Sequence, residues 1–316
     1  MGNLPELHLK SPLKNGCQTN VLNVSRSESP LAFKTWITVW RPKTFSCLSL
    51  WQDNVLGGHP FFNGLLSDNM LVYAIVFVCA YALALLVYRY DMYEKEPWYM
   101  LLLVVALGMA AAFGIGFVED IAIQSFNQHE SAGGQAAIAA FFEETAKLLI
   151  VVLVAVFFRH EFNDPIDGLV YGAYAGLAFA LYESLFYLSF TPTVPQQIGA
   201  EAVRLLLHLL MGGLAGFGLG LARFPKRLPL WPFVLPCGVV AAMGIHFFWD
   251  FWCGLPRDNV SEAFQRFAAV GLLLIATALF GVSVSMGVRR SRAMFSPKSQ
   301  KRLWGWPFSL LFRRRD

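Results

Sequence analysis

The stretch WYMLLLVVALGMAAAFGIGFV, residues 98–118, contains no charged side chain. A helix needs about 20 consecutive apolar residues to cross the roughly 30 Å of hydrocarbon in a bilayer, and this stretch is long enough. The whole sequence has the same character, because 56% of its 316 residues are hydrophobic and only 15% are charged. Its apolar residues come in long blocks rather than with the periodicity of an element half exposed to water, which indicates a membrane protein.

Further apolar blocks lie on both sides of this stretch, so we expect an all-α fold, a polytopic transmembrane helix bundle of about seven spans. The expected helices are 70–88, 98–118, 134–158, 166–190, 199–221, 231–253 and 264–288. They divide the chain into a polar N-terminal tail (1–68), a transmembrane domain (69–288) and a basic C-terminal tail (289–316). Residues 1–68 show no short apolar core followed by small residues, so we expect no removable signal peptide.

Basic residues are distributed unevenly among the connections between these helices. The connections 119–133 and 191–198 contain no Lys or Arg, whereas the C-terminal tail is rich in both. The positive-inside rule then predicts a multi-pass plasma-membrane protein with its N-terminus outside and its C-terminus in the cytoplasm. The net charge of +4 is explained by this topology, so the lipid bilayer is the expected surrounding and no nucleic-acid partner is expected. The five scattered cysteines lack a CxxC pair and argue against a disulfide framework or a zinc ribbon.

Ionisable residues interrupt four of the expected helices. Each such residue at mid-bilayer costs roughly 2.5–3.5 kcal/mol. Eight of them facing lipid would cost on the order of 20 kcal/mol, more than the net stability of a domain. We therefore expect these side chains to face one another or a water-filled cavity. They are Glu143, Glu144, Lys147, Glu183, Arg204, His208, His246 and Asp250.

The spacing of these residues supports a shared site. Residues four apart lie on one face of a helix. The pairs with this spacing are Glu143 with Lys147, Arg204 with His208, and His246 with Asp250. Counted along the expected helices at 1.5 Å per residue, one ionisable residue of each helix lies roughly 10–15 Å below the same membrane surface. The spacing therefore predicts that side chains from four helices meet at one depth.

Carboxylates and histidines together suit hydrolysis without a nucleophilic serine or cysteine. One carboxylate can take a proton from water while a histidine stabilises the oxyanion formed at a peptide carbonyl. Adjacent helical residues point about 100° apart, so Glu143 and Glu144 are expected to divide these tasks. One would face water and the other would pair with Lys147 or with a neighbouring helix. The residues themselves do not say which, and this scheme needs no cofactor.

The sequence resembles the PrsW family of intramembrane glutamic proteases, which are related more distantly to the CAAX prenyl proteases. The resemblance extends from about Tyr88 to Trp252. Its motifs are DMYEKEP at 91–97, EExxK at 143–147, DGLVYG at 167–172, FxxxE at 179–183, His208 before a glycine-rich segment, and HxxxD at 246–250. The order and spacing of these motifs are more specific than any one of them.

This resemblance implies residue roles and a substrate class. It implies that Glu143 activates the water, with Glu144 and Glu183 assisting, and that His208 belongs to the same cluster. It also implies that His246 stabilises the oxyanion together with Asp250. The implied substrates are single-span membrane proteins such as anti-sigma factors, cut within the membrane.

Three other functions remain open at this stage. A zinc metallopeptidase would use His208, His246 and a glutamate as ligands, although the sequence has no HExxH motif. A proton-coupled transporter would use the same carboxylates as a relay, although no inverted repeat is evident. An inactive scaffold would only bind membrane partners. Two features are interpreted as structural, namely Asp167 as a helix-start charge or cap and the glycines 212, 216 and 220 as a close-packing surface.

Overall fold

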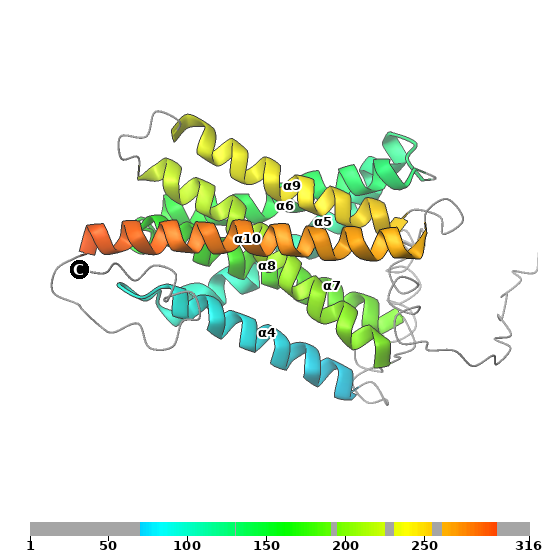
Figure 1. The fold of residues 1–316 in the computed structure, drawn as a ribbon, viewed down its shortest axis with the longest axis horizontal. Helices are drawn as coiled ribbons and strands as arrows, with labels where there is room; N and C mark the ends of the chain where they lie inside the picture. Colours follow the sequence, from blue (N-terminus) through cyan, green and yellow to red (C-terminus); the bar gives the residue numbers. More distant parts are fainter. Residues whose placement is uncertain (1–69, 130, 191–194, 225–230, 255–260, 296–316) are drawn as a thin grey trace, which may run out of the picture. The chain divides into compact units, whose positions relative to one another are not determined.

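The structure is a computed structural model that describes residues 70–129, 131–190, 195–224, 231–254 and 261–295. These residues form seven helices and no strand, as Figure 1 shows. The helices are α4 (Met70–Tyr90), α5 (Trp98–Ser125), α6 (Ala132–Phe157), α7 (Pro165–Phe190), α8 (Pro195–Arg223), α9 (Trp231–Gly254) and α10 (Glu262–Phe295). The predicted all-α bundle is confirmed, while the predicted tail 1–68 lies outside the described residues.

Six of these helices are long and apolar enough to cross a membrane. The exception is α6, which has 26 residues but carries the charged residues Glu143, Glu144 and Lys147. Two predicted helix ends were wrong, because α5 continues from 118 to Ser125 and α10 continues from 288 to Phe295. Charged residues lie at both points, yet side chains that face inward or that lie in the last turn of a helix do not end it.

Side chains and proline define where three of the helices begin. Pro97 occupies the N-cap position of α5 with an extended backbone, as expected for a residue that cannot donate a backbone hydrogen bond. The hydroxyl of Ser131 caps α6 by accepting a hydrogen bond from the backbone N–H of Gly134 at 3.0 Å. In the first turn of α7, Asp167 accepts backbone hydrogen bonds from Asn163 and Asp164 at 2.7 and 2.6 Å. The structural interpretation of Asp167 is therefore confirmed.

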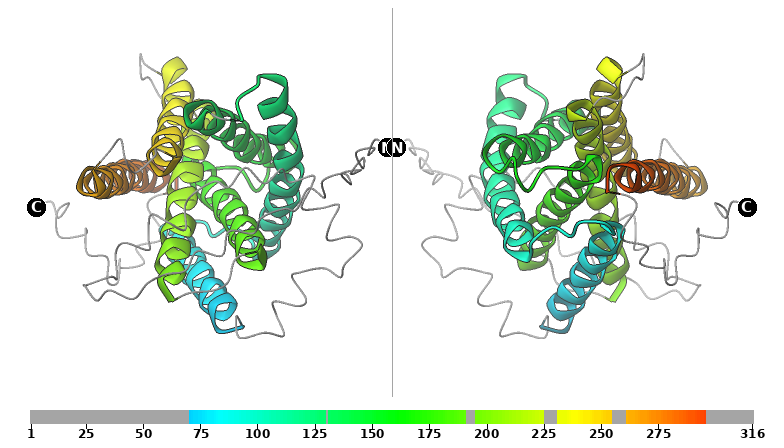
Figure 2. Two further views of the ribbon diagram at one scale, coloured as in Figure 1. Left: turned by 90° about the vertical axis from the view of Figure 1, so that its right-hand side faces the viewer. Right: turned by 90° about the vertical axis from the view of Figure 1, so that its left-hand side faces the viewer.

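Helices α7 and α8 form the centre of the bundle. In the apolar 18-residue segments that make α7 and α8 candidate membrane spans, 72% and 83% of the residues are buried. The corresponding share in the other four candidate spans is 17–28%. The end-on views of Figure 2 show α4, α5, α6, α9 and α10 arranged around this central pair. The pair that holds Glu183 and His208 is therefore the part of the protein best shielded from lipid.

Glycines allow the backbones of α7 and α8 to touch. A Cβ atom added to Gly212 would collide with the carbonyl oxygen of Gly172, and one added to Gly216 would collide with that of Gly168. A Cβ on Gly176 would meet the carbonyl oxygen of His208 in the same way. The predicted close packing is confirmed, and it fixes the position of α8, including His208, against α7.

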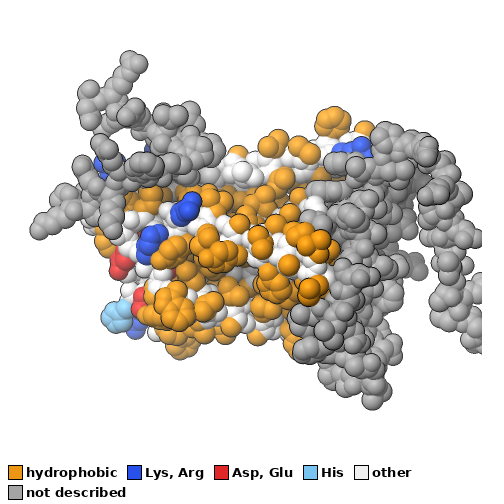
Figure 3. All heavy atoms as spheres, turned by 90° about the horizontal axis from the view of Figure 1, so that it is seen from below, with side chains coloured by type: hydrophobic (Ala, Val, Ile, Leu, Met, Phe, Trp, Pro, Cys, Tyr) orange, Lys and Arg blue, Asp and Glu red, His pale blue; other side chains and the backbone are white. Residues whose placement is uncertain are grey.

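The outer surface of the bundle is apolar. Large hydrophobic side chains are well exposed on α4, α5 and α10, for example Leu71 (69%), Ile121 (63%) and Phe267 (79%). Figure 3 shows hydrophobic side chains covering the middle of one such face. A continuous exposed apolar surface of this extent is typical of a protein surrounded by lipid.

Candidate functional site

Lys147 is the centre of a polar cluster inside the bundle. Its side chain is 1% exposed, and its Nζ atom lies 2.7 Å from Glu144 Oε1 and 3.3 Å from Glu143 Oε2. The same Nζ atom lies 3.0 Å from Nδ1 of His208 on α8. A buried ammonium needs such partners, because a charge buried without an opposite charge or hydrogen bonds strongly destabilises the fold. Lys147 thus joins the two carboxylates of α6 to α8.

Glu143 and Glu144 differ in their access to solvent. The side chain of Glu144 is fully buried, and its Oε1 atom accepts from Lys147 and faces Nδ1 of His246 at 2.8 Å. The side chain of Glu143 is 12% exposed and contacts Lys147 at longer range. Of the two, Glu143 is therefore the residue that a water molecule can reach.

His246 lies between two carboxylates. Its Nδ1 atom is 2.8 Å from Glu144 Oε1, and its Nε2 atom is 3.2 Å from Asp250 Oδ2, one helical turn along α9. As an imidazolium, His246 can donate a hydrogen bond to each carboxylate. The arrangement orients the ring firmly, and a substrate oxygen that binds to His246 has to replace one of these partners.

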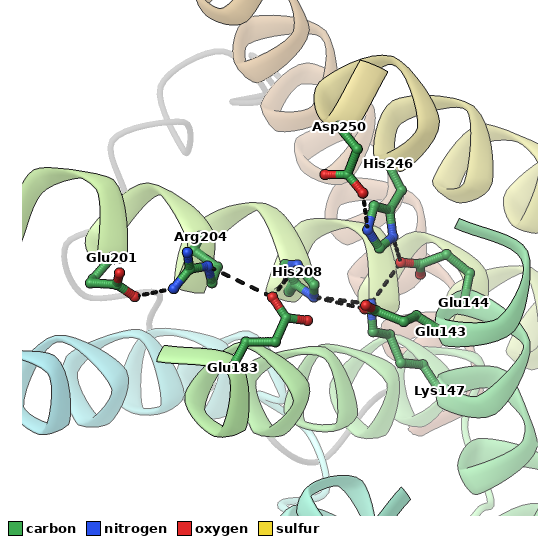
Figure 4. Close-up of polar contacts among 9 residues, drawn as sticks. All are labelled: Glu143, Glu144, Lys147, Glu183, Glu201, Arg204, His208, His246 and Asp250. Carbon is green, nitrogen blue, oxygen red and sulfur yellow. Dashed lines mark hydrogen bonds and ion pairs between the residues drawn. The ribbon is translucent and has the colours of Figure 1, made fainter. Parts of the chain in front are cut away.

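His208 has a less crowded environment on one side of its ring. Its Nε2 atom is 3.7 Å from Glu183 Oε2, which is longer than a hydrogen bond. The ring centroids of His208 and His246 are 5.2 Å apart. All seven residues that the sequence singled out as catalytic therefore lie in one cluster. Figure 4 shows them as a continuous chain of contacts across α6, α7, α8 and α9.

This chain continues toward the end of the bundle at which α7 ends and α8 begins. Arg204 pairs with Glu201 one turn earlier on α8, and its Nε atom is 3.7 Å from Glu183 Oε2. The guanidinium also lies over the ring of Tyr187, 4.7 Å from its centroid. Glu183 is thus a distant partner of Arg204, because Glu201 is the closer carboxylate.

Two further acidic residues near the cluster, Glu201 and Glu119, were not predicted from the sequence. Glu201 is 2% exposed, but it lies near the expected start of its helix, where acidic residues are common and need no special role. Glu119 lies just beyond the end predicted for α5. The charged groups with the strongest electrostatic interaction with it are members of the cluster. Glu119 is eleven residues, or three helical turns, after Gly108, but only the structure shows that Gly108 lies on the buried side of α5.

The cluster carries more negative than positive groups. The residues drawn in Figure 4 include five carboxylates but only two fixed cations, Lys147 and Arg204. With neutral histidines, three negative charges remain uncompensated if every carboxylate is ionised. Such an excess is costly in a site shielded from water, so protons, a bound cation or a substrate group must reduce it.

Three side chains of the cluster could hold a metal ion. Glu143, His208 and His246 each offer one ligand atom, and these atoms lie within 4.8 Å of one another. Within the described ranges, no other group of three His, Cys, Asp or Glu side chains has ligand atoms close enough together to hold a metal ion. Two histidines and one carboxylate are a common ligand set for zinc.

A second buried acidic network lies at the opposite end of the helices, where α5 and α7 begin. Asp91 accepts a hydrogen bond from the backbone N–H of Glu96 at 2.6 Å, and Glu96 accepts one from the hydroxyl of Tyr171. Burial raises the pKa of Asp91 to about 7 and that of Glu96 to about 8. These contacts attach the loop 91–97 to α7. The sequence marks 91–97 as a motif but gives no sign that its carboxylates are buried.

The fold and the cluster define a class of protein: a polytopic helical membrane protein whose interior holds a group of carboxylates and imidazoles suited to hydrolysis. Comparison with known families identifies the group within this class. The model of the PrsW family of intramembrane metalloproteases matches residues 96–282. Because the match covers more than half of the chain, the protein belongs to the PrsW family, as its motifs predict.

Two relatives support this assignment. Protease PrsW of Bacillus subtilis (strain 168) is 33% identical over 152 residues, which cover 45% of this chain and 65% of the relative. Protease PrsW of Geobacillus kaustophilus (strain HTA426) is 30% identical over 226 residues, which cover 69% of this chain and 94% of the relative. The alignment thus spans just under two thirds of the first relative and nearly all of the second. No solved structure matches the chain.

Proposed function

We propose that this integral membrane protein is an intramembrane endopeptidase that hydrolyses a peptide bond of a membrane-protein substrate at the cluster around Lys147. The observation that carries this proposal is the convergence of carboxylates and imidazoles from α6, α7, α8 and α9 in the interior of the bundle. A purely structural ion pair would need one carboxylate for Lys147. The additional carboxylates and both histidines are explained by catalysis.

Glu143 is the proposed general base. It is adjacent to the buried Glu144 but remains 12% exposed, so it can bind a water molecule while Glu144 stays paired with Lys147 and His246. The carboxylate takes a proton from this water, and the hydroxide oxygen attacks the carbonyl carbon of the substrate. When the C–N bond breaks, Glu143 returns the proton to the leaving amine.

The oxyanion that forms during the attack needs hydrogen-bond donors. His246 is the donor implied by the motifs, and Asp250 and Glu144 hold its ring in place. His208 lies beside it, and its Nε2 atom is 3.7 Å from Glu183 Oε2, which is longer than a hydrogen bond. His208 can therefore donate to the oxyanion from Nε2, and His246 can join it when the substrate oxygen replaces Asp250 or Glu144 as its partner. The charge of Lys147 reduces the negative potential around both rings.

A metal-dependent form of the same peptidase is the second candidate, favoured by the family description and by one observation. Glu143, His208 and His246 fit a metal ion in residue type and approximate spacing. They would hold the ion, which would act as a Lewis acid and offset the negative excess of the site. The geometry favours the first candidate, because the ammonium of Lys147 already contacts both Glu143 and His208.

The location of the site supports a substrate class, and the distribution of basic residues supports an orientation. A peptide bond can reach residues in the interior of the bundle when it belongs to a membrane segment, so the proposed substrates are single-span proteins, with anti-sigma factors as one example. The N-terminus is assigned to the outside and the C-terminus to the cytoplasm by the positive-inside rule. Cleavage then occurs in the outer half of the bilayer.

The experiment that tests this function compares membrane proteomes from cells that contain the wild-type protein or Glu143→Gln. Glu94, which is exposed in the loop 91–97, provides Glu94→Gln as a matched control for loss of one carboxylate. Fragment ends within membrane spans should appear with the wild type and the control but disappear with Glu143→Gln. Identical sets of fragment ends in all three samples would contradict the proposal.

A further inference from the structure

Glu119 lies on the buried side of α5, which packs against α6 and α7. The buried residues of α5 include Val104, Gly108, Ala112 and Ala122. With 100° between successive residues, Glu119 is only about 20° around the helix from Gly108. Gly108 faces α7 closely, since an added Cβ would collide with Ala178. Glu119 therefore points from α5 toward the interior of the bundle rather than toward lipid.

Glu119 lies beside the catalytic cluster, on the side toward the end of α5. The ring of Phe113 on α5 contacts that of Tyr182, the neighbour of Glu183, with centroids 6.2 Å apart. Glu119 follows Phe113 by six residues, so its backbone lies about 9 Å further along the helix axis, toward the end at which α7 ends. The ionisable groups that act most strongly on Glu119 are Glu143, Glu183, His246 and Asp250.

One oxygen of the Glu119 carboxylate is unpaired within the part of the chain that the structure describes. Its Oε1 atom is shielded from solvent and has no hydrogen-bond partner within the described residues. Of the four ionisable groups with the strongest electrostatic interaction with Glu119, three are carboxylates that repel its negative charge. The side chain as a whole is partly exposed, so a group outside the bundle can reach it. An unpaired carboxylate in this position favours a cationic group on the substrate.

We propose that Glu119 is a specificity-determining residue that binds a lysine or arginine side chain of the substrate close to the scissile bond. This inference rests on the proposed peptidase function and names the substrate class more narrowly. A basic residue within a membrane segment needs an anionic partner in the protein, because lipid offers none at that depth. Glu119 supplies this partner, and the basic side chain in turn reduces the excess of negative charge at the site.

The test uses the purified full-length protein in lipid nanodiscs and a panel of synthetic single-span peptides with Leu- and Ala-rich spans. In each peptide one lysine occupies a different position along the outer half of the span, and a matched peptide carries norleucine instead. Cleavage sites and rates are measured by mass spectrometry. The wild type should cut at a constant distance from the lysine. It should also prefer lysine over norleucine by at least about tenfold, the factor expected for a charge-assisted hydrogen bond.

The variant Glu119→Gln should lose this preference, so that it cuts lysine and norleucine peptides at similar rates. Glu94→Gln, at the other end of the helices, should keep it. Cleavage by the wild type without a lysine preference, or an unchanged preference in Glu119→Gln, would overturn the role of Glu119 but leave the peptidase intact. If the wild type cuts no peptide of the panel, the peptidase proposal itself fails. If Glu119→Gln does not fold, Glu119→Asp keeps the charge and should keep the preference at a shifted distance between lysine and cleavage site, and an unshifted distance would overturn the proposal.

Discussion

Lys147 on α6 and His208 on α8 lie with Nζ and Nδ1 only 3.0 Å apart in the interior of the bundle. Both side chains are nearly inaccessible to solvent, with 1% and 5% exposure. As the ammonium can only donate, Nδ1 of His208 accepts, and the proton of the neutral ring resides on Nε2. This contact therefore sets the tautomer of His208 and turns an N–H toward the side of the ring where Glu183 lies.

Removal of the Lys147 charge should destabilise the protein strongly. Lys147→Met leaves Glu143 and Glu144 buried without their cation, which is expected to cost about 3–5 kcal/mol of unfolding free energy. The double variant Lys147→Met/Glu144→Gln should recover part of this loss, because it also removes the more deeply buried carboxylate. Unfolding in mixed detergent micelles measures both effects, with the exposed Arg159→Met as control. Equal stability of Lys147→Met and Arg159→Met would contradict the central role of Lys147.

The contact between α7 and α8 should be sensitive to a single methyl group. Gly212→Ala forces a Cβ into the carbonyl of Gly172 and should cost about 1–3 kcal/mol. Gly244→Ala on α9 is the matched control, because nothing lies within 4 Å of its added Cβ. The control should be neutral or slightly stabilising, since alanine is the better helix former. Similar melting temperatures for the two variants would show that α7 and α8 are not in backbone contact.

The acidic network of the loop 91–97 should make stability depend on pH. Burial raises the pKa of Asp91 from 3.8 to about 7 and that of Glu96 from 4.5 to about 8, so the folded protein holds protons that the unfolded chain has lost. The stabilisation from these protons is complete below pH 4 and is lost as the pH rises through 7 to 8. Melting temperatures should therefore fall between pH 5 and pH 9.

The variant Asp91→Asn/Glu96→Gln removes the groups responsible for this pH dependence. Its melting temperature should change much less than that of the wild type over the same range. The exposed Glu94→Gln should keep the wild-type slope. A slope in the double variant as steep as that in the wild type would assign the pH dependence to other groups.

The two forms of the proposed mechanism differ in metal content. With Glu143 as an unaided base, protein purified without chelators should contain far less than one zinc per chain, and cleavage should survive a strong chelator. One metal ion per chain, absent from His208→Ala and His246→Ala, would instead establish the ligand set Glu143, His208 and His246. Inductively coupled plasma mass spectrometry measures this content independently of activity.

Much of the fold could be predicted because a bilayer sets strict physical limits. The thickness of hydrocarbon fixes the length of a span, so apolar blocks such as 98–118 located all seven helices, although two of them continue seven residues past the predicted end. The cost of a charge in lipid likewise required Glu143, Glu183, His208 and His246 to meet. The structure places these four residues in one cluster.

Other features depend on contacts that a single sequence does not display. Glu119 resembles the polar end of a span, and its inward direction appears only when α5 is seen to continue to Ser125. The choice between Glu143 and Glu144 required their different exposure, which depends on how α6 packs against α8 and α9. The burial of Asp91 likewise depends on how the loop 91–97 folds onto α7.

The most direct test is the cleavage of a single-span substrate by purified protein in nanodiscs, where transport cannot produce fragments. The wild type should release two fragments, whereas Glu143→Gln should be slower by about 10²–10⁴-fold, the usual contribution of a general base. The variant should insert into membranes and melt like the wild type. Equal cleavage rates for the wild type and Glu143→Gln would contradict the assignment of Glu143 as the residue that activates water.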